Sequence, residues 1–184
     1  MININIDFLN KCVLGASTDS TRYYLQGVNI QDIDGWRHYC GTNGHILIHC
    51  KEAIESDDEG LPEPITLKMD KPIADKFNGH TNMILNTKEM FATFKLSKIT
   101  SLAIIDGAYP DYFKVIPTNP SEPTEFSFFD WHYLQTVEKV LGKFEKTYAI
   151  LQDNADAPAV FTRADVEGVE VVIMPIRTKV VNNG

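Results

Sequence analysis

The chain has 184 residues, of which 43% are hydrophobic and 23% are charged, and its formal net charge is −8. These values exclude an intrinsically disordered chain and are typical of a globular protein long enough to bury a core. The acidic balance also argues against a generic nucleic-acid binder, although an acidic protein can still present one basic face.

The first unit that the pattern predicts is a strand, a helix and three further strands. Ile2, Ile4 and Ile6 alternate with asparagine, the period-two pattern of a half-buried strand. Asp7 is expected to cap a short helix that follows. The other strands are predicted at 22–30, 36–40 and 45–50, with a tight Asn43-Gly44 turn before the last.

The same order of elements is predicted a second time, in shorter form. The acidic stretch from Glu52 to Pro64 is expected to be a solvated connector. After it we expect at most two turns of helix at 72–77, because Pro72 suits a first helical turn. The strands of this second unit are predicted at 65–69, 82–85, 90–96 and 101–105.

A third copy follows a segment that Pro110 and Pro117 are expected to hold in an extended conformation. This segment is either an ordered connection between two packed units or an ordinary strand-to-strand connection. A strand at 125–129 leads to a helix from Trp131 to Leu141, which Asp130 caps and Gly142 ends. Its remaining strands are predicted at 148–152, 159–163 and 169–175. Three strand–helix–strands units, the middle one abbreviated, predict an α+β fold.

The third helix is amphipathic, and the face opposite its apolar stripe contains no acidic residue. The stripe consists of Tyr133, Leu134, Val137, Val140 and Leu141, and the opposite face of His132, Gln135, Thr136, Lys139 and Lys143. A solvated face that happens to carry two lysines explains this helix at least as well as a basic surface does.

A cluster of histidines and cysteines raises the question of a metal site. His38, Cys40, His45, His49 and Cys50 lie close together, but on strands their spacing places them on different faces and across a turn. None of the usual zinc spacings is present. The chain also lacks a glycine-rich phosphate loop, a nucleophile elbow and a clear carboxylate pair. We therefore expect no metal, no cofactor and no enzymatic activity.

The termini and the cysteines bear on the cellular compartment. The first residues lack the basic start and apolar run of a signal peptide, and no apolar run approaches the ~20 residues that span a bilayer. An odd number of cysteines without metal-like pairs is typical of a reducing compartment. We expect a cytoplasmic protein that does not contact a membrane.

Several stretches resemble the bacterial DNA polymerase III β subunit, the sliding clamp. Residues 21–28 (Thr-Arg-Tyr-Tyr-Leu-Gln-Gly-Val) and 41–47 (Gly-Thr-Asn-Gly-His-Ile-Leu) are similar to its middle domain. Residues 106–117 resemble the junction between its middle and last domains, and 171–177 its C-terminal strand. The motifs lie in the family's order. The resemblance implies the DNA-clamp fold, with antiparallel sheets outside and helices on an inner face.

The resemblance also implies a domain organisation. Residues 1–117 are expected to form a complete clamp-like domain of two half-units, and residues 118–184 a half domain that ends in the partner-binding strand. The family's first domain and half of its third would be absent, which puts its usual dimeric ring in doubt. We expect a homo-oligomer in which two chains pair their half-domains about a two-fold axis, and two such dimers could close a ring. The competing arrangement is a monomer.

In the family, a pocket between the middle and last domains takes short peptides of polymerases, the clamp loader and repair proteins. Matching residue by residue implies that its lining here is Leu25, Thr42, Gly44, His45, Ile46, Leu47, Pro110, Val115, Val172, Met174, Pro175, Ile176 and Arg177. Ile46 and Ile176 stand where the family commonly has arginine and methionine, which bears on the peptide that fits. These residues could instead be core strand residues, an alternative that suits Val172 better than Pro110 or Arg177.

The function that the resemblance implies is that of a processivity factor without catalysis. It would contact double-stranded DNA non-specifically and bind peptides of the DNA polymerase and the clamp loader. The candidate DNA-facing residues are Lys11, His132, Gln135, Lys139 and Lys143. The alternative is a non-encircling module that competes for clamp-binding peptides and so regulates replication. A third hypothesis, an enzyme with a Cys/His site, is the least supported by the sequence.

Overall fold

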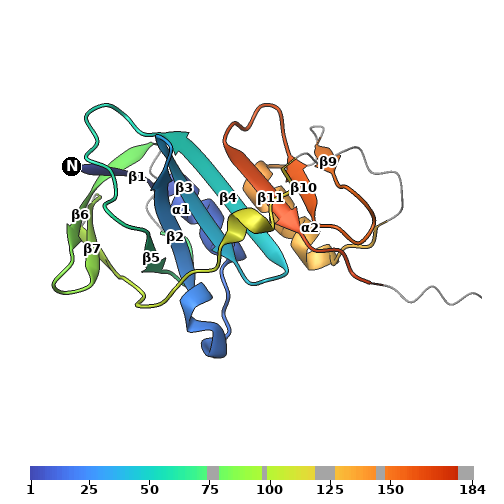
Figure 1. Cartoon of the computed structure of the whole chain (residues 1–184), viewed down its shortest axis with the longest axis horizontal. Coiled ribbons are helices and arrows are strands. Elements are labelled where there is room, and N and C mark those ends of the chain that lie inside the picture. Colours follow the sequence, from blue (N-terminus) through green and yellow to red (C-terminus); the bar gives the residue numbers. More distant parts are fainter. Residues whose placement is uncertain (74–78, 97–98, 119–126, 144–147, 178–184) are drawn as a thin grey trace, which may run out of the picture. The chain divides into compact units, whose positions relative to one another are not determined.

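The computed structural model describes residues 1–73, 79–96, 99–118, 127–143 and 148–177 (Figure 1). The chain divides into two compact units, Met1–Pro110 and Asp111–Gly184. The boundary expected after residue 117 lies inside the second unit, and the assignment of a whole and a half clamp domain stays a prediction.

The first unit is a β-rich body with one α-helix among its described residues. Its elements are β1 (Ile2–Asn5), α1 (Ile6–Cys12), the 3-10 helices η1 (Val13–Gly15) and η2 (Ser20–Leu25), β2 (Gly27–Ile33), β3 (Trp36–Thr42), β4 (Ile46–Ala53), β5 (Ile65–Lys68), β6 (His80–Asn86), β7 (Phe91–Lys95) and β8 (Ile99–Ala103). The strands predicted in this unit are confirmed with shifted ends, apart from the start of the one placed at 22–30. Most of the helix expected at 72–77 lies outside the described residues.

Two local predictions in this unit are wrong, and in both the reason is a helix cap. Arg22 lies in η2 rather than in a strand, because the Asp19 carboxylate accepts a hydrogen bond from the Thr21 amide (2.8 Å) and starts a helical turn there. At the start of α1 the cap is Asn5 and not Asp7, since the Asn5 side chain accepts from the Phe8 amide (3.2 Å).

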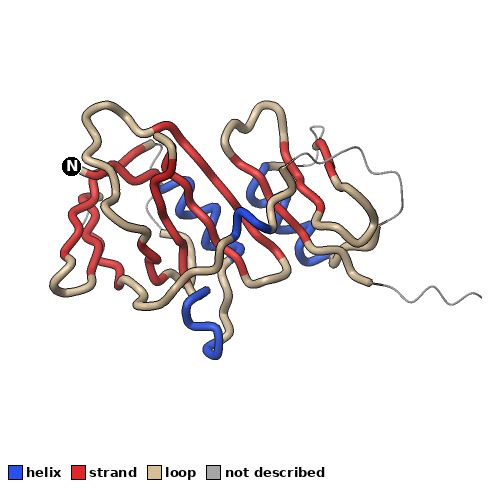
Figure 2. Tube along the Cα trace, viewed as in Figure 1, coloured by secondary structure: helices blue, strands red, loops and turns tan. Residues whose placement is uncertain are grey.

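The strands of the first unit exchange partners between its two halves (Figure 2). β2, β3 and β4 form a consecutive antiparallel run, and β5 from the second half pairs with β2. In return β1 from the first half pairs with β6, which continues into β7 and β8. The leading strand of each half therefore completes the sheet of the other half, which ties the two halves into one unit.

Helix α1 packs against β3 and β4 and buries Ile6, Leu9 and Cys12. The approach to β3 is close at Gly41, where a Cβ atom would lie 1.9 Å from the Cys12 carbonyl oxygen. Only glycine leaves room for the backbone of the helix at this position. The aromatic ring of Tyr39, on the same strand, is fully buried beside Phe8.

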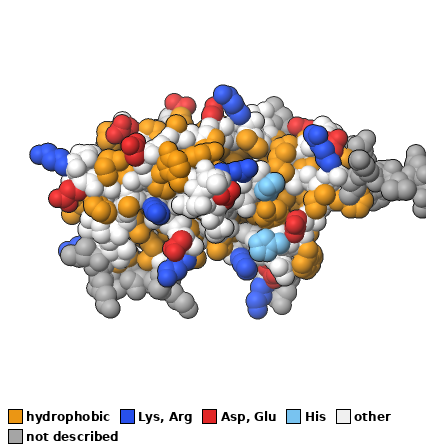
Figure 3. Space-filling model, turned by 90° about the horizontal axis from the view of Figure 1, so that it is seen from below, with side chains coloured by type: hydrophobic (Ala, Val, Ile, Leu, Met, Phe, Trp, Pro, Cys, Tyr) orange, Lys and Arg blue, Asp and Glu red, His pale blue; other side chains and the backbone are white. Residues whose placement is uncertain are grey.

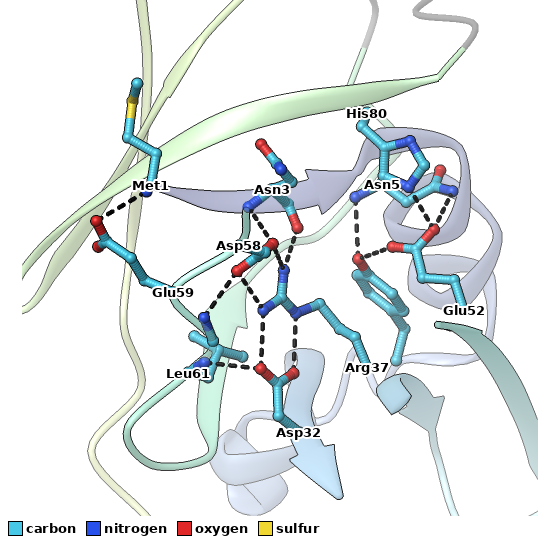
Figure 4. A network of polar contacts seen from close by, with 12 residues as sticks. Met1, Asn3, Asn5, Asp32, Arg37, Glu52, Asp58, Glu59, Leu61 and His80 are labelled. Carbon is cyan, nitrogen blue, oxygen red and sulfur yellow. Dashed lines mark hydrogen bonds and ion pairs between the residues drawn. The ribbon is translucent and has the colours of Figure 1, made fainter. Parts of the chain in front are cut away.

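The acidic stretch that was expected to be solvated is held by a buried arginine (Figure 4). Arg37 is 2% exposed; its guanidinium contacts Asp32 at 2.8 and 2.9 Å and Asp58 at 2.8 and 3.1 Å, and it also donates to the Asn3 carbonyl. Burial raises the pKa of Asp58, but hydrogen bonds from Arg37, Asn3 and Gly60 outweigh burial and keep this pKa below its ordinary value. The expectation that this connector is solvated is therefore wrong at Asp58.

The second unit contains η3 (Tyr112–Lys114), α2 (Trp131–Leu141) and the antiparallel strands β9 (Ala149–Leu151), β10 (Ala159–Thr162) and β11 (Val169–Ile173), in the order β11-β10-β9. As predicted, Asp130 caps α2 by accepting from the His132 amide (2.8 Å), and Gly142 ends it with φ 93°. α2 packs against β11.

Three expectations for the second unit need correction. Residues 111–117 are not fully extended, because Tyr112–Lys114 forms a 3-10 turn. The described part of the strand predicted at 125–129, which begins at Ser127, has no strand pairing. Thr136, placed on the exposed face of α2, is buried and bonds back to the His132 carbonyl (3.2 Å).

No helix within the described ranges has the length and apolar character needed to cross a membrane.

Candidate functional site

The residues predicted to bind peptides fall into two sets, one on each unit. The set on the first unit is Leu25, Thr42, Gly44, His45, Ile46, Leu47 and Pro110, and the set on the second is Val115, Val172, Met174, Pro175, Ile176 and Arg177. We describe the geometry of each set within its own unit.

The loop between β3 and β4 carries the centre of the first set and is held by its own side chains. The Thr42 hydroxyl donates to the Ile46 carbonyl (2.7 Å) and accepts from the Gly44 amide (3.1 Å). The Asn43 side chain accepts from the amides of His45 (2.9 Å) and Ile46 (3.1 Å). Gly44 has φ 90°, a conformation that side chains disfavour. The loop is therefore preorganised, with Gly44 and His45 exposed.

η2 and the segment that follows β8 both lie beside the β3–β4 region of the first unit. Arg22 donates to the Asn43 carbonyl (3.2 Å), and a Cβ on Gly107 would lie 3.3 Å from the Tyr23 ring. The Tyr109 hydroxyl donates to the carbonyl of Cys40 (3.3 Å), and burial raises the pKa of Tyr109 well above its usual range. The structure thus places Arg22 and Tyr109 beside the candidate site.

Arg22 and Tyr109 were absent from the predicted set. Both stand inside the motif stretches that carry the family resemblance, which is the signal that could have found them.

Burial separates the members of the two sets. Leu25, Ile46, Leu47 and Val172 are nearly fully buried. Among the large apolar members, Met174 is 37%, Val115 40% and Ile176 48% exposed. Only the exposed members can offer side-chain surface to a ligand, and their role in peptide binding stays a prediction.

The segment that follows β11 is fixed close to the start of α2. The Ile176 amide donates to the Phe128 carbonyl (2.7 Å), which holds residues 174–177 in an ordered path after the strand ends. Met174, Ile176 and Phe128 are all exposed apolar side chains. The flexible thioether of Met174 suits a surface that accepts several ligands.

The residues predicted to face DNA differ in their position on the helices and in the contacts that their side chains make. His132, Gln135 and Lys139 are exposed along α2, whereas Lys143 is exposed but lies beyond the end of the helix. Lys11, on α1, forms an ion pair with Asp7 one turn away. Its ammonium also lies 5.6 Å from the centroid of the Phe8 ring.

The surface does not carry a continuous basic field on the face that Figure 3 shows. Lysine and arginine side chains (blue) are interspersed there with aspartate and glutamate (red) and with apolar groups. Non-specific DNA affinity comes from neutralised phosphates. Any contact with DNA would therefore depend on local groups of lysines rather than on the charge of this whole face.

Two pairs involve residues of the histidine and cysteine cluster, one within it and one between Cys50 and Cys12, which lies outside it. His38 Nδ1 and His49 Nε2 lie 2.9 Å apart with their rings stacked, and the Cys12 and Cys50 sulfurs are 3.7 Å apart in the core. Burial raises the pKa of the Cys50 thiol well above its usual range. Within the part of the chain that the structure describes, no three His, Cys, Asp or Glu side chains are placed to hold a metal ion.

Comparisons of the sequence and of the structure with known proteins both find beta sliding clamps. No family model matches the chain. The beta sliding clamp of Caulobacter vibrioides is 26% identical over 120 residues, 61% of this chain and 32% of that clamp. The beta sliding clamp of Halalkalibacterium halodurans is 27% identical over 140 residues, 73% of this chain and 36% of that clamp.

A solved beta sliding clamp of C. crescentus superposes with a TM-score of 0.79 at 18% identity, covering 96% of this chain and 65% of that one. The structure therefore has the DNA-clamp fold, and the predicted α+β architecture with antiparallel sheets is confirmed. The chain spans about two thirds of the solved clamp, and the sequence match covers about a third of each curated relative.

Proposed function

We propose that this chain, which belongs to the beta sliding clamp family, is a clamp-like processivity factor that contacts double-stranded DNA non-specifically and binds peptides of replication proteins. The observation that carries the proposal is the agreement with a solved clamp over 96% of the chain. The exposed loop at Gly44 and His45 and the exposed Met174 and Ile176 support a peptide-binding role. No catalytic step is part of this function.

A short peptide that contains glutamine and leucine or phenylalanine is expected to bind with micromolar affinity, about −8 kcal/mol. The Met174→Glu variant is expected to abolish this binding, because the ligand would bury an unpaired carboxylate. Fluorescence anisotropy of a labelled peptide measures the effect.

Ile84→Glu is the matched control for this experiment, because Ile84 is an apolar residue on β6 that is 63% exposed and outside the candidate site. The control is expected to bind the peptide as the parent does. Unchanged affinity in Met174→Glu would remove the second set from the proposed site. The same measurement on His45→Glu tests the first set separately.

Contacts with DNA are expected to come from lysines and not to read sequence. In the Lys139→Glu/Lys143→Glu variant, the slope of log K against log salt should flatten by about one unit for each lost phosphate contact. Titration of labelled duplex DNA at several salt concentrations measures the slope. Lys88→Glu/Lys95→Glu, which changes two exposed lysines outside the candidate DNA-facing residues, controls for net charge. An equal slope in all three proteins would contradict the assignment.

A non-encircling module that competes for clamp-binding peptides is the second candidate. The net charge of −8 and the pairing of Lys11 with Asp7 favour it, because both weaken attraction to phosphates. Peptide binding together with no measurable DNA binding at low salt would select this function over the first.

A further inference from the structure

A row of exposed apolar side chains crosses β2, β3 and β4 in the first unit. Trp36 of β3 lies directly opposite Ile33 of β2 on one side and Ala53 of β4 on the other. Directly paired residues point to the same face of a sheet, so the three side chains are neighbours. Ile33 is 38% and Trp36 is 43% exposed, and Ala53 is exposed as well.

This row lies on the face of the sheet opposite α1. The ring of Tyr39 packs edge-on against Phe8 of α1, with 5.6 Å between the ring centroids. Trp36 stands three positions before Tyr39 on β3, and because side chains alternate along a strand, Trp36 points away from the helix. The row is also separate from the candidate peptide site of this unit. Thr42, at the other end of β3, lies about 20 Å away along the extended strand.

The turn that joins β2 to β3 adds acidic side chains to the edge of this row. Asp34 is in the turn itself and is exposed. The Ile54 amide donates to the Gly35 carbonyl (2.9 Å), which brings Glu55 close to the same turn. Glu55 is exposed too, and neither Asp34 nor Glu55 takes part in the Arg37 network.

The acidic loop after β4 is fixed beside the row (Figure 4). The Asp58 carboxylate binds the Arg37 guanidinium (2.8 Å), and the Leu61 amide donates to the Asp32 carboxylate (2.7 Å). These contacts hold the loop at two points, while Asp57 stays exposed. A surface that is already ordered loses less conformational entropy when it binds a partner.

We propose that this surface binds a segment of another protein that carries basic and apolar side chains. The Trp36 surface, as we call it, combines three apolar with three acidic residues: Ile33, Trp36, Ala53, Asp34, Glu55 and Asp57. The apolar row is covered by the partner's apolar side chains, and the carboxylates at its edge attract lysine and arginine. The face of the tryptophan ring attracts cations as well, since the Lys51 ammonium lies 5.3 Å from the centroid of the Trp36 ring.

The charges disfavour the other occupants of such a surface. A second copy of this chain, joined through the same surface about a two-fold axis, would bring the three acidic residues of each chain together. DNA and anionic lipids carry the same sign of charge as these carboxylates. A basic protein segment is the occupant whose charge complements the surface. The proposal does not depend on whether the chain binds DNA or clamp-binding peptides.

Fluorescence anisotropy of a labelled peptide of alternating lysine and leucine tests the Trp36 surface. The parent chain is expected to bind this peptide and not its counterpart of alternating glutamate and leucine. Glu55→Lys/Asp57→Lys is expected to weaken binding of the lysine peptide about tenfold and to gain binding of the glutamate peptide. Trp36→Ser is expected to weaken binding of the lysine peptide by a similar factor, because the central apolar contact is lost. Circular dichroism spectra that match that of the parent show that each variant folds.

Asp153→Lys/Asp156→Lys is the matched control, because it makes the same change of charge at two exposed residues of the second unit. This control is expected to bind the lysine peptide as the parent does. Equal weakening in the two double variants would show attraction by net charge alone and overturn the proposal. No binding by the parent, or unchanged binding by Trp36→Ser, would overturn it too. The glutamine-containing peptide used with Met174→Glu is expected to bind all these variants equally, which keeps this test separate from that of the proposed function.

Discussion

Replacing Arg37 with methionine is expected to lower the free energy of unfolding by about 3–5 kcal/mol. The guanidinium is the charged partner of two carboxylates, Asp32 and Asp58, whose side chains are 11% and 2% exposed. Methionine fills part of the space but leaves both carboxylates short of hydrogen bonds and unpaired in a largely dry environment. The loop that Asp58 fastens beside β1 would lose its attachment as well.

Urea denaturation followed by circular dichroism measures this change. Lys114→Met is the control, because Lys114 forms an exposed ion pair with Asp111, and such pairs contribute little. Combining Arg37→Met with Asp32→Asn and Asp58→Asn removes the unpaired charges, and we expect it to recover part of the lost stability. A midpoint in Arg37→Met equal to that of the control would show that the buried pairs do not hold the loop.

Gly41→Ala is expected to destabilise the first unit by about 3 kcal/mol, the upper end of the usual range for overpacking. The added methyl group would lie 1.9 Å from the Cys12 carbonyl oxygen, which belongs to the backbone and has no rotamer that moves it away. To relieve the collision, α1 must move away from β3 and β4, and the packing of Leu9 and Cys12 is lost with it. Urea denaturation followed by circular dichroism measures this loss of stability.

Gly35→Ala separates this collision from backbone strain. Gly35 has φ 81° but no atom within 4 Å of the added Cβ, so its substitution costs only the left-handed conformation, about 1 kcal/mol. If Gly41→Ala lowers the free energy of unfolding no more than Gly35→Ala does, α1 moves away from the strands without a loss of stability. The close packing of helix on sheet would then not be a source of stability.

Much of the local structure could be predicted because its causes lie within a few residues of one another. The limits of α2 follow from a carboxylate at Asp130 and a left-handed glycine at Gly142, and both are visible in the sequence. The β3–β4 turn follows from Asn43-Gly44 in the same way. The motifs around residues 21–28 and 41–47 also indicated the clamp family.

The candidate site could be predicted only in part. The exposed Gly44, His45 and Met174 were identified from the motifs, but Leu25, Ile46 and Leu47 are nearly fully buried. A motif preserves core residues and ligand-binding residues alike, and only burial tells them apart. Arg22 and Tyr109 were missed because their contacts with Asn43 and Cys40 join residues distant in the chain.

The sequence by itself determined the type and order of the strands and of α2, through the apolar period and the caps, together with the resemblance to the clamp family. The tertiary structure decided which strands pair. β1 and β5 have the same alternating or apolar character as their neighbours, so nothing local directs β1 to β6 and β5 to β2. The tertiary structure also decided that Asp58 is buried, although its neighbours in sequence indicate a solvated loop. A carboxylate is buried only where a partner such as Arg37 offsets its desolvation, and that partner comes from a distant strand.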